Sequence, residues 1–342
     1  MTTARLVSLV PALASSLLVG GCFLLPDNDT QFVQADDVRL ELPGMVQDRD
    51  VDGSKIHGDV HDLVLVTSDR VNTWVTEIVE VSARVVEYLD GVPETAREGD
   101  VRVYGPYADR DGRDLAWLVK IGEDDAGTRF ETFIGPRSAE GAADMDRLMS
   151  GELVVGDGTR SGGFEMDFDV VEKYEEIKGP NGALYTYSGA LAVTFEREIE
   201  TDKKHIDIEF KGLTALYDGF LDSDEFHSDD TYTYHREGDG SGTFQLSLLG
   251  EWDDFNWSGP AQEKMTLQAA WSAEGEGRTR GTIVEVDGVG DMKHGDLQVD
   301  ECFGGDGYLT WRQINEAYVV EVPDYNFGEA KSCALDEAAL GG

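Results

Sequence analysis

Basic residues are scarce in this chain of 342 residues, which has 28 Lys and Arg against 69 Asp and Glu and a formal net charge of −41. A surface this acidic repels nucleic acid and anionic lipid head groups, because both carry negative charge. We therefore expect no nucleic-acid partner. The acids are spread along the whole sequence, so solubility is their first interpretation, and cation binding is the alternative.

Motifs of known catalytic sites are also missing. The sequence has no Gly-x-Ser-x-Gly, Ser-x-x-Lys, Walker or His-Glu-x-x-His motif. His57 and His61 are four residues apart and could bind zinc on a helix, but Gly58 disfavours that helix and a polar helix entrance is the better interpretation. We expect a protein that is not an enzyme. A hydrolase with an unrecognised pair of carboxylates is the alternative.

Long hydrophobic runs are absent, and the N-terminal run is short. It covers about 14 residues before Cys22, against the ~20 that a membrane-spanning helix needs. Its end, Leu17-Leu18-Val19-Gly20-Gly21-Cys22, resembles the lipobox of bacterial lipoproteins. The resemblance implies that residues 1–21 are a signal peptide and that Cys22 is acylated, whereas an ordinary cleaved signal would not need a cysteine there. Two acyl chains hold a protein stably on a membrane.

The position after the cysteine predicts a location. Phe23 stands there, and not the Asp that retains many such lipoproteins in the inner membrane. The resemblance therefore implies a lipid-anchored protein of the cell envelope, in the outer membrane, with residues 22–50 as lipidated tether and linker.

Cysteine is rare, with three residues in all. If Cys22 is lipidated, Cys302 and Cys333 remain as a pair, which in an oxidising compartment favours a disulfide. The bond would close a loop of about 30 residues and add ~3–4 kcal/mol in the chain-entropy model.

An acidic segment opens like a calcium-binding loop. Asp48, Asp50 and Asp52 alternate before a glycine, so three carboxylates can converge on one cation. The match then weakens, because the twelfth position is Asp59 in place of the bidentate Glu. Calcium at these four residues is the one cofactor that the sequence suggests; otherwise we expect none.

One segment has a clear helical period. Apolar residues recur at helical spacing from Ser68 to Leu89, with Ser68 as the expected N-cap, and Gly91 and Pro93 follow. Earlier in the chain, Val38 to Leu42 alternates and predicts a first strand. The region from Ile56 to Val66 could add a turn or an earlier helix. The sequence therefore predicts an N-terminal amphipathic helix within a helical segment over residues 51–99.

From about residue 100 the period changes to two. Alternating runs include 115–121, 164–170, 191–195, 206–210, 244–248 and 265–271, and a short helix is expected near 171–177. Asp-Gly or Asn-Gly pairs separate them at 111–112, 157–158, 181–182, 239–240, 287–288 and 306–307. The pattern predicts an antiparallel meander of about ten or eleven strands over residues 100–342.

The two parts are expected to form one structural unit over 51–342. Eleven strands ~4.8 Å apart make a sheet ~50 Å wide, and one helix ~10 Å across cannot cover its apolar face. The fold class is therefore mainly β, a large curved antiparallel sheet, half-barrel or barrel-like, with the helix packed on its apolar face.

In the order of its elements alone, the chain resembles the half-barrel of the LolA/LolB carriers and related lipid-binding lipoproteins. From Val71 onward, by the helix, the glycine-bounded hairpins and the closing Glu301-Cys302 … Cys333 segment, it also resembles lipoproteins of myxobacterial type. Neither resemblance brings catalytic residues. The leading functional hypothesis is an envelope protein that holds an apolar ligand such as a lipid in the concavity of the sheet. The alternative is a structural or partner-binding module with a filled core.

Overall fold

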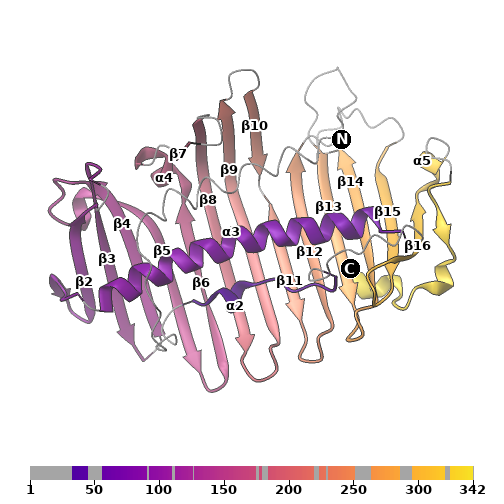
Figure 1. Ribbon diagram of the computed structural model, residues 1–342, viewed down its shortest axis with the longest axis horizontal. Helices are drawn as coiled ribbons and strands as arrows, with labels where there is room; N and C mark the ends of the chain where they lie inside the picture. The colour runs from indigo at the N-terminus through magenta and orange to yellow at the C-terminus, as the bar shows by residue number, and fades with distance from the viewer. Residues whose placement is uncertain are drawn as a thin grey trace. The chain divides into compact units, whose positions relative to one another are not determined.

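The computed structural model describes residues 33–44, 56–90, 92–109, 112–125, 127–174, 177–178, 184–218, 223–228, 230–250, 263–285, 295–319 and 324–341. This part of the chain is mainly β, with a large open antiparallel sheet and few helices (Figure 1). It divides into two compact units. Unit 1 comprises residues 1–39, 73–199 and 208–228, and unit 2 comprises residues 40–72, 200–207 and 229–342.

Unit 1 is built on consecutive antiparallel hairpins. Its strands are β1 (Ala96–Glu98), β2 (Val101–Ala108), β3 (Leu115–Asp124), β4 (Gly127–Pro136), β5 (Asp146–Gly156), β6 (Thr159–Asp167), β7 (Ile177–Lys178), β8 (Leu184–Glu198), most of β9 (Lys204–Asp218) and β10 (Ser223–Ser228). Its helices are α2 (Ala35–Val38), α4 (Phe168–Tyr174), a 3₁₀ turn (Ala142–Asp144) and the second part of α3 (Asp59–Asp90).

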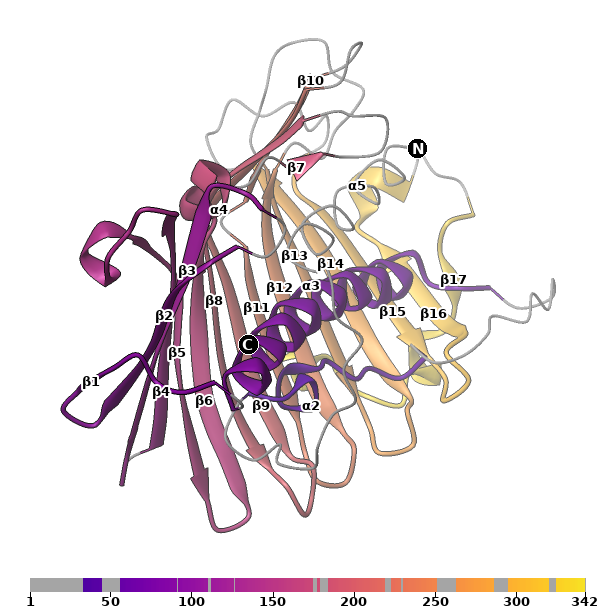
Figure 2. The same ribbon diagram turned by 60° about the vertical axis from the view of Figure 1, so that its left-hand side comes forward.

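The second part of α3 lies on one face of the unit 1 strands (Figures 1 and 2). Leu89 is buried in a cluster with Tyr104 of β2 and with Val119 and Ile121 of β3. The ring of Trp74 meets Phe210 of β9 edge-on at 5.8 Å between centroids. We call this the helix face of unit 1, and its opposite the open face.

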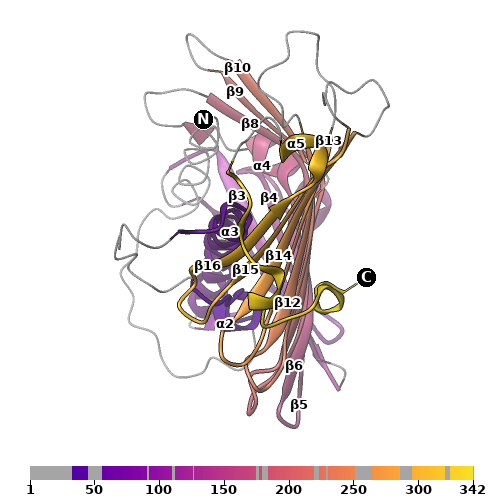
Figure 3. The same cartoon turned by 90° about the vertical axis from the view of Figure 1, so that its right-hand side faces the viewer.

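Unit 2 continues the same hairpin pattern. It contains the start of β9, then β11 (Thr231–Arg236), β12 (Gly242–Gly250), β13 (Glu263–Trp271), β14 (Gly277–Glu285), β15 (Leu297–Phe303), β16 (Leu309–Ile314), α5 (Glu316–Val319), β17 (Phe327–Gly328) and 3₁₀ turns at Ala330–Ser332 and Glu337–Leu340. The first part of α3 packs closely on β14, since a Cβ added at Gly281 would lie 3.1 Å from Val60 Cγ2 (Figure 3).

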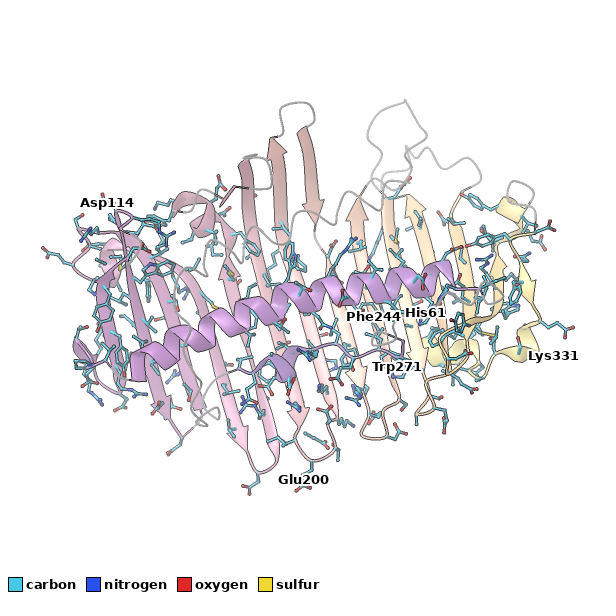
Figure 4. The ribbon with its side chains drawn as sticks, viewed as in Figure 1. His61, Asp114, Glu200, Phe244, Trp271 and Lys331 are labelled. Carbon is cyan, nitrogen blue, oxygen red and sulfur yellow. A yellow bond between two sulfur atoms is a disulfide. The ribbon has the colours of Figure 1, made fainter. Side chains whose placement is uncertain are left out.

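The core of unit 2 follows the predicted alternation. Phe244 and Leu246 of β12 are directly opposite Ala269 and Leu267 of β13, and all four are buried. Figure 4 labels Phe244, together with Trp271 at the end of β13 and His61 on α3. Apolar side chains at every second position therefore point to the same side of these strands.

The predicted hairpin turns are confirmed where the structure describes them. Gly158, Gly240 and Gly307 all have positive φ, at 75°, 90° and 77°, between β5 and β6, β11 and β12, and β15 and β16. Positive φ is the conformation that glycine adopts without steric cost. The predicted turns at 181–182 and 287–288, and the Asp of the 111–112 pair, lie outside the described residues.

The strand count differs from the prediction. In the part of the chain that the structure describes, the sheet has 17 strands, whereas alternation alone predicts about ten or eleven. Three of the additional strands, β1, β7 and β17, have only three, two and two residues. A strand of two or three residues is too short to show the alternation of apolar and polar residues by which the sequence predicts strands.

Ser68 is not the N-cap of the helix, which starts earlier, within residues 56–66. The helix begins at Asp59, nine positions before Ser68, which is fully buried inside it. The described start has a partner far away in the sequence: the Glu301 carboxylate accepts the backbone N–H groups of Asp59, Val60 and His61. Because the capping residue, Glu301, comes from β15, the residues around position 59 contain no pattern that would predict the start of the helix there.

Two predicted strand segments are also corrected. Residues 39–42 form no strand after α2; instead the Asn72 side chain donates to the Leu40 carbonyl oxygen and accepts its N–H, each at 2.7 Å. The alternating run at 164–170 ends as a strand at Asp167, whose Oδ1 accepts the N–H groups of Asp169 and Val170 at 2.9 and 3.3 Å. The Asp167 carboxylate caps the start of α4, because Asp is a favoured helix cap. The sequence predicted this short helix slightly later, near residues 171–177.

Candidate functional site

A groove of about 780 Å³ lies on the strands of unit 1. It crosses β3, β4, β5, β6 and β8, and Val101 of β2 reaches its edge. Lys120 and Gly122 line it, whereas Val119 and Ile121, the alternate residues of β3, pack with Leu89 of α3. Because neighbouring residues of a strand point to opposite faces, the groove belongs to the open face.

Small residues make the hollow. One cross-strand row runs from Gly122 through Arg129 and Glu152 to Gly163 and Thr194. A Cβ added at Gly163 would lie 2.4 Å from the Val193 carbonyl oxygen. Glycine inside a strand marks a close approach of backbone, so β8 leaves no room for a side chain at Gly163, and none rises from this position of the row.

The floor offers hydroxyl groups. Ser150, Ser161 and Thr194 line the groove on β5, β6 and β8. Ser150 is directly opposite Glu131 of β4 and Glu165 of β6, and both glutamates line the groove as well. The surface thus combines hydroxyl groups, which donate and accept hydrogen bonds, with carboxylates that accept them.

The basic residues at the groove already have acidic partners. Lys120 Nζ lies 2.8 Å from Glu98 Oε2, and Arg129 is paired with Asp124. Among the residues that the structure describes, Glu152 has no ion-pair partner, although it lies in the central row of the groove. A ligand that donates hydrogen bonds or carries positive charge would therefore find its acceptor at Glu152.

The other notable group is the buried Glu301 of unit 2. Its Oε1 accepts the N–H of Asp59 at 2.8 Å, and its Oε2 accepts those of Val60 and His61 at 3.0 and 2.9 Å. Burial raises the pKa of Glu301 from its ordinary 4.5 to about 7, although the His61 N–H lowers it. A Cβ added at Gly58 would lie 2.3 Å from Glu301 Oε2, so the glycine makes room for the carboxylate.

Asp59, the last of the four predicted calcium ligands, binds protein groups. Its Oδ2 accepts hydrogen bonds from Arg312 Nη1 and from the Tyr325 hydroxyl, each at 2.9 Å. Asp48, Asp50 and Asp52 lie outside the described residues, as does Cys22. Within the described ranges, no group of three or more His, Cys, Asp or Glu side chains could hold a metal ion.

The two histidines considered for zinc contact aromatic rings. The buried His61 ring stacks on Phe303 of β15 with 3.9 Å between centroids and 9° between planes. His57 precedes the helix and lies 4.7 Å from the ring of Tyr308. They are not on one helix face, because α3 begins between them.

The two remaining cysteines lie together in unit 2. The sulfur atoms of Cys302 and Cys333 are 2.14 Å apart, a disulfide distance, with 5.4 Å between the Cα atoms. Cys302 is on β15 and Cys333 follows the 3₁₀ turn Ala330–Ser332. Close by, Ser332 Oγ donates to the Thr310 carbonyl oxygen of β16 at 3.0 Å. The segment after β17 is therefore attached to the sheet of unit 2 by a covalent and a polar contact.

Comparisons with known proteins add no relative: no protein-family model, curated protein or solved structure matches this chain.

Of the helices that the structure describes, none is both long and apolar enough to cross a membrane.

The sequence alone did not point to the groove or to Glu301. The groove depends on which residues of β3, β4, β5, β6 and β8 face one another, and that register is set by pairing across hairpins. Glu301 stands more than 200 residues from the helix that it caps. Its only local signal is that a Glu occupies a buried position between Val299 and Phe303, where a charge needs a partner.

Proposed function

We propose that this protein is a lipid-anchored, non-catalytic binding module of the cell envelope, which holds a polar ligand rich in hydrogen-bond donors, such as a glycan chain, in the groove of unit 1. The observation that supports it best is the groove itself: about 780 Å³, within the range of known ligand sites, with a hydroxyl-bearing floor and an unpaired Glu152 among the described residues.

The helix face of unit 1 favours the filled-core alternative over a lipid cavity. Leu191 and Val193 of β8 are 0% and 1% exposed, and Phe164 of β6 and Val75 of α3 are similarly buried. Side chains of the protein thus take the apolar contacts that a lipid tail would need. A polar ligand is better placed on the open face, where hydroxyl groups and Glu152 line the groove beside the apolar Val101 and Val154.

The lipid anchor at Cys22 and the outer-membrane location are part of the proposal and rest on the lipobox-type segment. Half-barrel curvature of the sheet is also part of the proposal, and it rests on the mismatch in width between a wide sheet and a single helix. Changing Cys22 to Ser should move the protein from the membrane fraction to the soluble fraction. Retention in the membrane would contradict the anchor.

The groove is tested by native mass spectrometry of the Cys22→Ser chain, which without its acyl chains needs no detergent, mixed with neutral oligosaccharides, amino-oligosaccharides and phospholipid. We expect an oligosaccharide complex. Glu152→Gln should weaken it about tenfold, because a hydrogen bond to a charged group contributes ~1.5–3 kcal/mol. Ser150→Phe should abolish binding by filling the floor.

Glu196→Gln is the matched control, since Glu196 is an exposed glutamate of β8 that does not line the groove, and it should bind like the parent. A bound phospholipid with no oligosaccharide would refute the groove proposal in favour of a carrier. Cleavage of the oligosaccharide would favour the hydrolase alternative.

A further inference from the structure

The last part of the chain lies on the side of the unit 2 strands that faces away from α3. Val60 of α3 packs on β14 at Gly281, and neighbouring residues of a strand point to opposite faces, so Arg280 points to the other side. There the 3₁₀ turn Glu337–Leu340 lies against β13 and β14, close to the end of the chain (Figure 3). We call this side of β13, β14 and β15 the tail face, and residues 334–341 the C-terminal segment.

Two arginines of β14 stand on the tail face, two positions apart. The Arg280 guanidinium donates to Asp300 Oδ1 of β15 from Nε at 3.0 Å and from Nη2 at 2.8 Å, and Arg278 Nη2 lies 3.4 Å from the same oxygen. Two guanidinium groups thus share one carboxylate of the sheet. In a chain with a formal net charge of −41, this pair is a local excess of positive charge, which a carboxylate from elsewhere can neutralise.

The C-terminal segment supplies that carboxylate. Glu337 pairs with Arg280 Nη2. Three positions later Leu340 is buried, and the Gln268 side-chain amide donates to the carbonyl oxygens of Leu340 and Gly341 at 3.5 and 3.3 Å. A buried apolar anchor flanked by polar contacts is the usual means by which a protein surface recognises a short peptide.

The contacts of the segment with the sheet are few and leave a donor unused. Of residues 334–341 only Leu340 is buried, and the Glu337 side chain is 65% exposed, so its ion pair contributes little. On the sheet, Arg278 Nε is buried and has no hydrogen-bond partner among the described residues. A ligand with one more acceptor would therefore satisfy the tail face better than the segment does.

The segment can leave the tail face and still stay beside it. The disulfide joins Cys333, just before the segment, to Cys302 of β15, which is directly opposite Arg278. A segment tethered at that point is present at high effective concentration and competes with any ligand from outside.

We propose that the tail face, with Gln268, Arg278 and Arg280, binds an acidic peptide segment of a partner protein, with a carboxylate three positions before a leucine. In the free protein the C-terminal segment occupies this site as an intramolecular ligand. A partner peptide displaces it by making the same contacts and by using the spare donor of Arg278. The inference depends on neither the lipid anchor nor the groove of unit 1.

The test is isothermal titration calorimetry of the chain carrying Cys22→Ser with a synthetic peptide of residues 334–341, amidated at its C-terminus. Salt at about 0.15 M screens the repulsion between the peptide and distant acids of the protein. The double variant Glu337→Gln/Leu340→Ala frees the site, and it should bind the peptide at least tenfold more tightly than the parent, whose own segment competes.

Two controls are matched to this comparison. Glu329→Gln removes the same charge from the end of the chain, but Glu329 pairs with Lys331, so this variant should bind the peptide like the parent. The same peptide carrying Glu337→Gln and Leu340→Ala should not bind the freed site.

Several results would overturn the proposal. Equal affinity of the parent and the double variant for the peptide would do so, as would binding to neither. Adding Arg280→Gln to the double variant should weaken binding at least tenfold, and unchanged affinity would show that the peptide lies elsewhere. If circular dichroism shows that the double variant does not fold, Glu337→Gln alone replaces it, and it must bind more tightly than Glu329→Gln.

Discussion

The pH dependence of Glu301 tests the contact between α3 and β15. The perturbation is Glu301→Gln, which keeps the shape and one acceptor oxygen of the side chain and removes its titration. Because burial raises the pKa of Glu301 from 4.5 to about 7, the folded protein favours the protonated carboxyl more than the unfolded chain does. The stabilising contribution of the proton is complete below pH 4.5 and is lost as the pH rises through 7.

The size of the effect follows from the two pKa values. The difference between a pKa of 4.5 in the unfolded chain and about 7 in the folded protein corresponds to about 3 kcal/mol, since a tenfold change in proton affinity is 1.36 kcal/mol. Most of this free energy is lost as the pH rises from 5 to 8. Over that range the free energy of unfolding of the parent should therefore fall by about 2–3 kcal/mol relative to that of Glu301→Gln.

Urea unfolding at pH 5, 6, 7 and 8, followed by tryptophan fluorescence, gives this difference, since the other titrating groups are common to both proteins. Glu274→Gln is the control, because Glu274 is exposed in the turn between β13 and β14, and its profile should parallel that of the parent. If the Glu301→Gln profile also stays parallel to the parent within ~0.5 kcal/mol, the three backbone hydrogen bonds hold the pKa near its ordinary value and the reasoning from burial is wrong.

Two further substitutions test buried contacts. Asp37→Asn should destabilise unit 1 by about 3–5 kcal/mol, because it leaves the buried guanidinium of Arg160 without its counter-charge; thermal unfolding measures this, and a loss below ~1 kcal/mol would contradict it. The double substitution of Cys302 and Cys333 by Ser should cost about 3–4 kcal/mol, and thiol labelling of the denatured, unreduced parent should find both cysteines blocked; reaction at either would exclude the disulfide.

Local periodicity predicted much of the sheet correctly. The alternation of Phe244 and Leu246, and of Leu267 and Ala269, is enough to identify two strands and the face that each buries. The Asp-Gly pair at 239–240 is enough to identify the turn before them. These features depend on residues a few positions apart, which is the range over which a sequence pattern acts.

Features that depend on distant partners were not predictable in this way. Asp37 reads as one of many acids, and only the fold brings it to Arg160, 123 residues away. Ser68 is a residue type that often caps helices, but here it is buried inside the helix. The helix starts earlier because the Glu301 carboxylate accepts the N–H groups of its first turn. The groove needs Gly122, Glu152 and Gly163 in one row, and no pattern in the linear sequence specifies their register.

The link between Glu301 and the first turn of α3 also bears on how the chain is made. The acceptor for the Asp59, Val60 and His61 N–H groups is synthesised some 240 residues after the donors. Contacts of such long range form slowly, since the intervening chain must first be closed into a loop. The capped start of α3 therefore cannot form before residue 301 has been synthesised, however early the rest of the helix takes shape.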